Sequence, residues 1–143
     1  MEKEIGSDYL ARIKKTVYML FVDDESIIIE SSLKALKRRF KEVYTANNGE
    51  AGWDAFKKYK PDLVVTDLVM PITDGIELIK RIRDVDKVIP IIVMTALNEE
   101  EYLTKAKDFS IQGYLMKPVD EKAFWELLFN VAYSVCVNKC VPC

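Results

Sequence analysis

Residues 62–83 read DLVVTDLVMPITDGIELIKRIR and contain the two patterns that decide the fold. The segment begins with a short apolar run, Leu63–Thr66, of the kind found in strands buried on both faces of a parallel sheet. Farther along, Ile76, Ile79 and Ile82 recur at a spacing that places them on one face of a helix. A buried strand followed by an amphipathic helix predicts a βα unit.

The same alternation extends in both directions from this segment. Short apolar runs that we interpret as strands occur at Val17–Val22, Glu42–Ala46, Leu63–Thr66, Ile89–Met94 and Gly113–Met116. Each is followed by a longer stretch with helical periodicity. Strict alternation of this kind predicts an α/β fold with right-handed crossovers and helices on both faces of a parallel sheet.

Residues that commonly begin helices lie between the strand candidates. We expect helices to begin after Asn48, near Asn98 and at Asp120, since Asn and Asp are favoured N-caps. Glu101 follows Asn98 by three residues, which resembles a capping box. In the first helical stretch the apolar residues that share one face are Ile29, Leu33, Leu36 and Phe40.

The composition limits the chemistry that the chain could carry out. Its 143 residues suit one domain, and a net charge of −2 provides no broad basic surface for nucleic acid. Histidine is absent, which excludes Ser-His-Asp and Cys-His catalysis and histidine metal sites. No apolar run reaches about 18 residues, and the start MEKEIGSDYL lacks the apolar core of a secretion signal. We therefore expect a cytoplasmic protein that contacts neither a membrane nor nucleic acid directly.

Polar side chains follow the predicted strands at the edge where parallel α/β sheets bind ligands. They are Asp23 and Asp24 after the first strand, Asp67 after the third, Thr95 at the fourth and Lys117 at the fifth. Any one of them alone would be read as a helix cap or a solvated side chain. Three neighbouring carboxylates, however, repel one another unless a cation neutralises them. Carboxylates without His or Cys suit Mg²⁺.

Four stretches, VYMLFVDDE, DLVVTDLVMPITDGIELIKRIR, IPIIVMTA and GYLMKPV, resemble the signature segments of bacterial response-regulator receiver domains. The resemblance covers roughly residues 16–136. It implies a doubly wound, five-stranded parallel sheet of the flavodoxin-like type with strand order 2-1-3-4-5. We expect an N-terminal extension at 1–15 that could be helical, a receiver domain at 16–137 and a tail or linker at 138–143.

The resemblance also implies a role for each strand-end residue. Asp67 would accept a phosphoryl group from a phosphohistidine on a sensor histidine kinase or a phosphotransfer protein. The Mg²⁺ ligands would come from Asp23, Asp24, Asp67 and the backbone carbonyl of Val69. Lys117 and the Thr95 hydroxyl would contact the phosphoryl oxygens. The chain would be a signalling switch and not an enzyme.

Further positions match the switching machinery of the family. Ala96 is small enough to leave room for the phosphoryl group, Gly75 would allow a tight turn, and the Lys117-Pro118 peptide would be cis. Thr95 and Tyr114 would move on phosphorylation and alter a surface formed by the helix after Asn98, the strand 113–116 and the helix after Asp120. A downstream effector or a fused output domain would read that surface.

Two apolar positions bear on how long the phosphoryl group would stay in place. Val69 and Leu97 occupy positions that tune the lifetime of the acyl phosphate in this family. Since neither side chain can orient an attacking water, we expect slow self-dephosphorylation.

The chain departs from many family members near its carboxyl end. Gln112 and Gly113 stand where receivers joined to winged-helix domains carry an acidic pair, which puts their charged dimer interface in doubt. The helix after Asp120 is apolar nearly all round, so either another segment covers it or it leaves apolar side chains at the surface. A homodimer formed through this helix or through the N-terminal extension would supply such a cover, as would the extension of the same chain. The apolar residues of that extension are Ile5, Tyr9, Leu10 and Ile13.

Cysteine occurs only at the carboxyl end, as Cys136, Cys140 and Cys143. This spacing can hold a metal or an iron–sulfur cluster. We favour instead a Cys136 packed along the last helix and a frayed tail.

Three other functions fit the sequence less well than that of a receiver domain. A phosphatase of the dehalogenase type needs a second Asp two residues beyond the nucleophile, where this chain has Val69. A flavin- or nucleotide-binding domain would want a glycine- or hydroxyl-rich loop after the first strand, but DDES is acidic. A degenerate receiver used only for binding would not need Asp67, Thr95 and Lys117 together.

Overall fold

The computed structural model describes residues 7–70 and 72–139, and the side chains of all of these except Ser7 and residues 26–29. Some sequence expectations therefore lie outside the described part of the chain. These concern the side chain of Ile29 and the residues Ile5, Cys140 and Cys143.

Five parallel strands form a single sheet in the order β2-β1-β3-β4-β5. The strands are β1 Tyr18–Val22, β2 Glu42–Ala46, β3 Leu63–Asp67, β4 Ile91–Thr95 and β5 Gly113–Met116. The predicted fold class and strand order are confirmed. All residues of β3 and β4 are buried, as expected for central strands covered on both faces.

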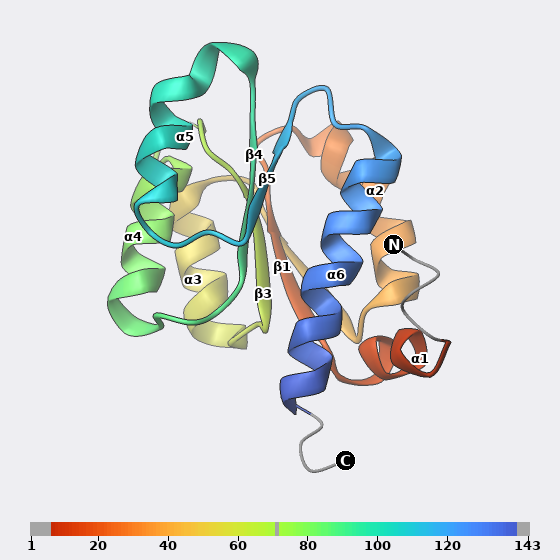
Figure 1. Ribbon diagram of the computed structural model, residues 1–143. Coiled ribbons are helices and arrows are strands. Elements are labelled where there is room, and N and C mark those ends of the chain that lie inside the picture. The colour runs from red at the N-terminus through yellow and green to blue at the C-terminus, as the bar shows by residue number, and fades with distance from the viewer. Residues whose placement is uncertain (1–6, 71, 140–143) are drawn as a thin grey trace.

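Helices cover both faces of the sheet (Figure 1). They are α1 Ser7–Thr16, α2 Ser26–Arg39, α3 Gly49–Tyr59, α4 Gly75–Val85, α5 Glu100–Lys107 and α6 Glu121–Lys139, with a short 3-10 helix η2 at Leu97–Glu99. In the view of Figure 1, α3, α4 and α5 lie on one face, and α2 and α6 lie on the other. Each face buries its own apolar cluster against the sheet.

Two of the three predicted helix starts are confirmed. The Asn48 side chain accepts a hydrogen bond from Ala51 N at 2.8 Å, and the Asp120 side chain accepts one from Ala123 N at 2.9 Å. The capping box predicted for Asn98 and Glu101 is wrong. The chain enters η2 before α5, and the N–H of Ala96 donates to a side chain three residues on, that of Glu99.

Strand ends differ slightly from the apolar runs in the sequence. The fourth strand begins at Ile91 and not at Ile89, because Pro90 between them has no N–H for the ladder. The third strand extends one residue farther and includes Asp67, which pairs in register with Met94. The phosphoacceptor candidate is therefore the last residue of a buried strand.

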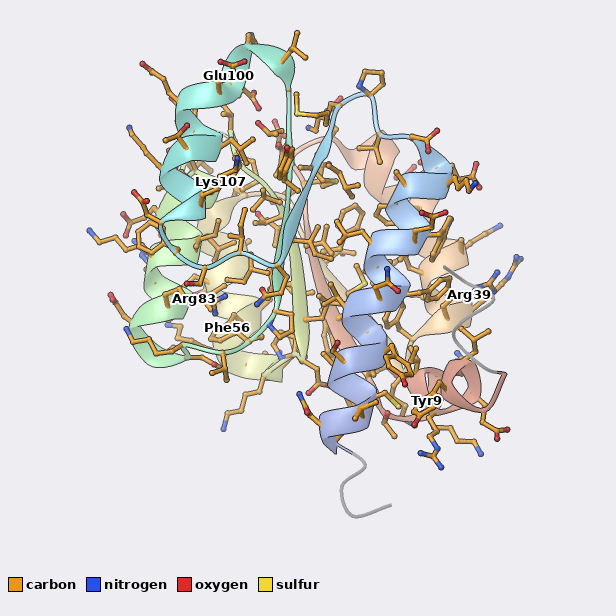
Figure 2. The ribbon with its side chains drawn as sticks, viewed as in Figure 1. Tyr9, Arg39, Phe56, Arg83, Glu100 and Lys107 are labelled. Carbon is orange, nitrogen blue, oxygen red and sulfur yellow. The ribbon has the colours of Figure 1, made fainter. Side chains whose placement is uncertain are left out.

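The apolar helix α6 is covered by the N-terminal extension of the same chain. The rings of Tyr9 of α1 and Tyr133 of α6 meet edge to face, with their centroids 4.6 Å apart. Ile13 is fully buried in the core beside α6. Figure 2 shows Tyr9 where α1 meets the lower turns of α6. Cys136 is fully buried on the same helix. Among the described helices none is both long and apolar enough to span a bilayer.

The positions that depart from the family's acidic pair have structural roles here. The Gln112 side chain accepts a hydrogen bond from Ile91 N at 2.6 Å at the start of β4. A Cβ on Gly113 would lie 2.9 Å from a methyl carbon of Leu127. These two residues therefore hold the edge of the sheet and let α6 pack closely on β5.

The turn between α5 and β5 is held by a buried arginine of α4. Arg83 is only 6% exposed and donates hydrogen bonds to the backbone carbonyls of Phe109, Ser110 and Asp86 at 2.7, 3.1 and 3.1 Å. Figure 2 shows Arg83 at the boundary between α4 and this turn. Burial lowers the pKa of Arg83, with the nearby charge of Asp86 acting in the opposite direction.

Candidate functional site

The predicted site residues come together at the carboxyl edge of the sheet, at the top of Figure 1. Asp67 and Thr95 are the last residues of neighbouring strands, and Asp23 follows β1. All three are buried, with exposed fractions of 2%, 1% and 0%. Buried polar side chains need hydrogen-bond or ionic partners.

Lys117 pairs with Asp67 across the site. Its Nζ donates to Asp67 Oδ2 at 2.7 Å and lies 3.6 Å from an oxygen of Glu25. The backbone N–H of Lys117 donates to Thr95 O at 2.7 Å, and the peptide bond to Pro118 is cis. The lysine is thus fixed at its backbone and directed toward the acidic residues.

Four carboxylates gather around one point. Asp23, Asp24, Glu25 and Asp67 each offer an oxygen, and these oxygens all lie within 4.8 Å of one another. Asp23 Oδ1 accepts from the N–H of Glu25 at 2.9 Å. Two buried oxygens in this group, Asp23 Oδ2 and Asp67 Oδ1, have no hydrogen-bond partner among the residues that the structure describes. Unpaired buried carboxylate oxygens are costly, and this group of oxygens could hold a cation that would offset the cost.

The pKa values of the site residues reflect the same shortage of positive charge around the buried carboxylates. Burial raises the pKa of Asp67 to about 6, although the hydrogen bond and charge of Lys117 act to lower it. Burial also raises the pKa of Asp23, against the opposing hydrogen bond from Glu25 N. Burial alone would lower the pKa of Lys117, but its hydrogen bond to Asp67 and the surrounding acidic charges raise it overall. One lysine does not balance this group of carboxylates.

The donor set fits a hard divalent cation. It consists of carboxylate oxygens on adjacent loops, with Asp24 and Glu25 exposed to solvent and Asp23 and Asp67 buried. Oxygen ligands with room for water are typical of Mg²⁺ sites. Val69, whose carbonyl was expected to contribute, is two residues beyond Asp67 and partly buried.

At the end of β4, a carboxylate of η2 contacts two of the residues expected to lie beside a phosphoryl group, Thr95 and Ala96. Glu99 Oε1 accepts from Ala96 N at 2.9 Å and from Thr95 Oγ1 at 3.3 Å. The first of these is a hydrogen bond of ordinary length, and the second is long for an O–H donor. The Thr95 hydroxyl is therefore held only loosely.

Gly75 serves the site in a way that differs from the sequence prediction. Its backbone does not adopt a positive φ, so it is not a turn glycine. Instead, a Cβ at this position would lie 2.1 Å from the carbonyl oxygen of Asp67, and Gly75 N donates to Leu68 O at 2.8 Å. Only glycine lets the start of α4 approach the Asp67 backbone this closely.

The predicted switch aromatic faces outward in this structure. Tyr114 is 44% exposed, and Lys107 Nζ of α5 lies 5.0 Å from the centre of its ring. Leu97 is also exposed, at 76%, beside the mouth of the site. Tyr114 thus belongs to the surface between α5 and α6.

Two residues in or beside the site were not predicted from the sequence. Glu25 belongs to the acidic group, and its place directly after Asp23-Asp24 was the available signal. Glu99 lies three residues after Ala96, which cannot cap through its own side chain. No cap pattern therefore pointed to Glu99.

Comparisons with known proteins agree with this geometry. Residues 19–129 match the family model described as response regulator receiver domain. The chain is 34% identical over 113 residues to the chemotaxis protein CheY of Halobacterium salinarum, covering 79% of this chain and 94% of that protein. It is 35% identical over 100 residues to the alkaline phosphatase synthesis transcriptional regulatory protein PhoP of Bacillus subtilis, covering 70% of this chain but 42% of that protein. The chain thus spans nearly all of the first relative and less than half of the second.

Solved structures show the same likeness in three dimensions. The REC domain of AraT, a response regulator from Geobacillus stearothermophilus, superposes with a TM-score of 0.77 at 28% identity, covering 86% of this chain and 98% of that one. The chemotaxis response regulator CheY4 of Vibrio cholerae superposes with a TM-score of 0.72 at 27% identity, covering 81% and 98%.

Proposed function

Because this chain belongs to the response-regulator receiver family, we propose that it is the phosphoacceptor of a two-component signalling system and that Asp67 carries the phosphoryl group. The observation behind this proposal is the state of the Asp67 carboxylate. One oxygen is held by Lys117 at 2.7 Å, while the other is buried and has no hydrogen-bond partner in the described part of the chain. A carboxylate that is oriented by one group and unsatisfied on its other side is suited to act as a nucleophile.

The reaction forms one bond and breaks one. A free oxygen of Asp67 bonds to phosphorus as the bond from phosphorus to the imidazole nitrogen of the donor breaks, and that electron pair stays on the imidazole. Lys117 and the Thr95 hydroxyl donate hydrogen bonds to the oxygens of the transferring group. Their contribution is electrostatic and positional, as in other phosphoryl transfers.

The cofactor in this proposal is Mg²⁺, held by Asp23, Asp24 and Asp67 with the carbonyl of Val69. When bound, it supplies positive charge that offsets both the carboxylates and the incoming phosphoryl group. Glu25 lies within the same acidic group, and its carboxylate would add negative charge beside a bound cation.

The partners follow from the same role. A sensor histidine kinase or a phosphotransfer protein would donate the phosphoryl group. A downstream protein or an attached output domain would read the surface formed by α5, β5 and α6, where Tyr114 lies exposed. Movement of Thr95 and Tyr114 would shift the population between two states of that surface.

The acyl phosphate would be long-lived, because the two positions that tune its lifetime in this family carry Val69 and Leu97, whose side chains have no polar atom to orient water. Val69 is partly buried and Leu97 is exposed. A Val69→Asn, Leu97→Glu double variant should lose its phosphoryl group faster than the wild type, as measured by the decay of phosphoprotein after the donor is removed. An unchanged decay rate would contradict this part of the proposal.

The proposal is tested by incubating the protein with acetyl phosphate and Mg²⁺ and measuring its intact mass. The wild type should gain one phosphoryl group, and Asp67→Asn should gain none. Asp62→Asn is the matched control, since it removes the same charge at the other end of β3 and should still be phosphorylated. Phosphorylation of the Asp67→Asn variant at the wild-type level would disprove the assignment.

A further inference from the structure

The carboxylate of Glu99 lies where two hydrogen-bond donors meet at the end of β4. Its Oε1 accepts from the backbone N–H of Ala96 at 2.9 Å and from the hydroxyl of Thr95 at 3.3 Å. The N–H of Glu99 also donates to Ala96 O at 3.0 Å, which closes the first turn of η2. Glu99 is thus folded back onto the strand end, although it lies at the start of a solvent-facing helix.

The direction of the Ala96 N–H follows from its neighbours in the ladder. The carbonyl of Thr95 accepts from Lys117 N at 2.7 Å, so it points toward the β5 side. In a planar trans peptide the N–H of the next residue points the opposite way. The Ala96 N–H is therefore directed toward the β3 side, and β3 ends in Asp67.

The end of β3 at Asp67 is paired with β4 two residues before Ala96. Leu68 N donates to Met94 O at 3.2 Å, so the two strand ends remain paired past Asp67. A group bound to the Asp67 carboxylate would extend beyond this pair, toward the Ala96 N–H and the Thr95 hydroxyl. In the resting chain Glu99 Oε1 already occupies both donors.

We propose that Glu99 is an intramolecular competitor of the phosphoryl group: its carboxylate holds the Ala96 N–H and the Thr95 hydroxyl in the resting chain and must leave them when Asp67 is phosphorylated. This inference rests on the proposed function of Asp67. A phosphoryl group brings additional negative charge to a place where an anionic oxygen already lies. Two anions on the same donors repel each other, and the covalently attached one remains.

The displacement of Glu99 would also connect the site to the surface that partners read. Glu99 is the last residue of η2, and α5 begins at Glu100. Once the carboxylate leaves Ala96, the first turn loses one of the contacts that tie it to β4. The start of α5 can then shift relative to β5, on the same surface as Tyr114.

A purely structural role for Glu99, as a cap of η2, makes a different prediction. A cap would affect stability but would not compete with ligands at Asp67. The Glu99→Gln variant separates the two roles, because glutamine keeps an oxygen that can accept from Ala96 N but carries no charge. Glu100→Gln is the control, since it makes the same charge change one residue away on an exposed side chain.

The experiment measures the rate of phosphorylation by acetyl phosphate with Mg²⁺, and the affinity for beryllofluoride, a phosphoryl mimic. Glu99→Gln should be phosphorylated about fivefold faster than the wild type and bind the mimic more tightly by a similar factor, as expected from removing one neighbouring charge. Glu100→Gln should stay within about twofold of the wild type. The advantage of Glu99→Gln should shrink as salt is added, because added ions screen repulsion between charges.

The possible results separate this inference from the proposed function. A wild type that is neither phosphorylated nor able to bind the mimic overturns the role of Asp67, and the role of Glu99 with it. A wild type that is phosphorylated while Glu99→Gln and Glu100→Gln behave alike leaves Asp67 in place and overturns the competition. A Glu99→Gln variant that is slower than the wild type also overturns it, because Glu99 would then assist the reaction.

Discussion

Two aspartates lie at opposite ends of β3 and differ in almost every respect. Asp62, just before the strand, accepts hydrogen bonds from Tyr18 N and from Lys139 Nζ, each at 2.9 Å. Asp67, the last residue of the strand, is bound by Lys117 through one oxygen, and no described residue is a hydrogen-bond partner of the other oxygen. The side chain of Asp62 is 23% exposed, whereas that of Asp67 is 3% exposed.

The difference separates the two ends of the sheet. At the amino end, charges are paired and α1 packs against α6, so the contacts there stabilise the fold. At the carboxyl end, several acidic groups are gathered with too few partners, and this arrangement costs stability unless a ligand completes it. A strained polar site supported by a well-packed remainder is typical of functional sites.

The largest effect on stability is expected at the amino end. Ile13 of α1 is fully buried in the core, so Ile13→Ala should lower the free energy of unfolding by about 2–5 kcal/mol. Urea denaturation would measure this loss. Under conditions where the variant is folded, Asp67 should still be phosphorylated. A loss of phosphorylation from the folded variant would show that the two ends are not independent.

A gain in stability is expected at the carboxyl end. Burial raises the pKa of Asp67 from 3.8 to about 6, so the protonated form is favoured in the folded state. The associated stability is fully present below pH 3.8 and is lost as the pH rises through about 6. Without metal at pH 7, Asp67→Asn should therefore be more stable than the wild type by about 1–3 kcal/mol.

This second prediction has a pH-dependent signature. The difference in melting temperature between Asp67→Asn and the wild type should be small at about pH 4 and grow toward pH 7, with a chelator present throughout. Differential scanning calorimetry across that range would measure it. A wild type that is the more stable protein at pH 7 would contradict the view that the Asp67 charge is poorly compensated.

A smaller effect is expected on the affinity for Mg²⁺. Asp23 Oδ2 is buried and lacks a hydrogen-bond partner among the described residues. Asp23→Asn should therefore weaken Mg²⁺ binding at least about tenfold, the loss found even for groups that only support metal ligands. Isothermal titration calorimetry would measure the affinity. Asp62→Asn is the matched control and should bind Mg²⁺ as the wild type does. Equal weakening in both variants would point to a general effect of charge.

The smallest effect is expected for Asp62 itself. Its ion pair with Lys139 is partly exposed, at 23% and 36% for the two side chains, and such pairs contribute about 0.2–1 kcal/mol. Asp62→Asn should therefore lower the free energy of unfolding by no more than about 1 kcal/mol. Denaturation at low and high salt would test this, because the loss should diminish when salt screens the pair.

Much of the fold could be predicted because local patterns and the tertiary structure agree. Buried parallel strands read as apolar runs, and Asn48 and Asp120 cap their helices as their types suggest. The start of α5 could not be predicted, because a 3-10 turn precedes it, and at the start of that turn the Glu99 side chain accepts from the N–H of Ala96. That contact depends on how the chain folds back at the end of β4.

Which residues form the site could be predicted better than which of their charges are paired. Strand-end positions identified Asp23, Asp67, Thr95 and Lys117, because parallel strands bring their carboxyl ends to one edge. Which oxygens are paired and which are not depends on burial and on the direction of Lys117, and neither is encoded locally. The packing of α1 against α6 likewise involves a long-range contact, between Tyr9 and Tyr133, which local sequence patterns do not reveal.

The central claim is that Asp67, and no other residue, carries the phosphoryl group. The most direct test is to phosphorylate the wild type with acetyl phosphate and Mg²⁺, reduce the acyl phosphate with borohydride, and sequence the resulting peptides by mass spectrometry. Reduction converts a phosphorylated aspartate to homoserine, and we expect homoserine at position 67 alone. Homoserine at another position, or its absence from a sample that has gained a phosphoryl group, would contradict this account.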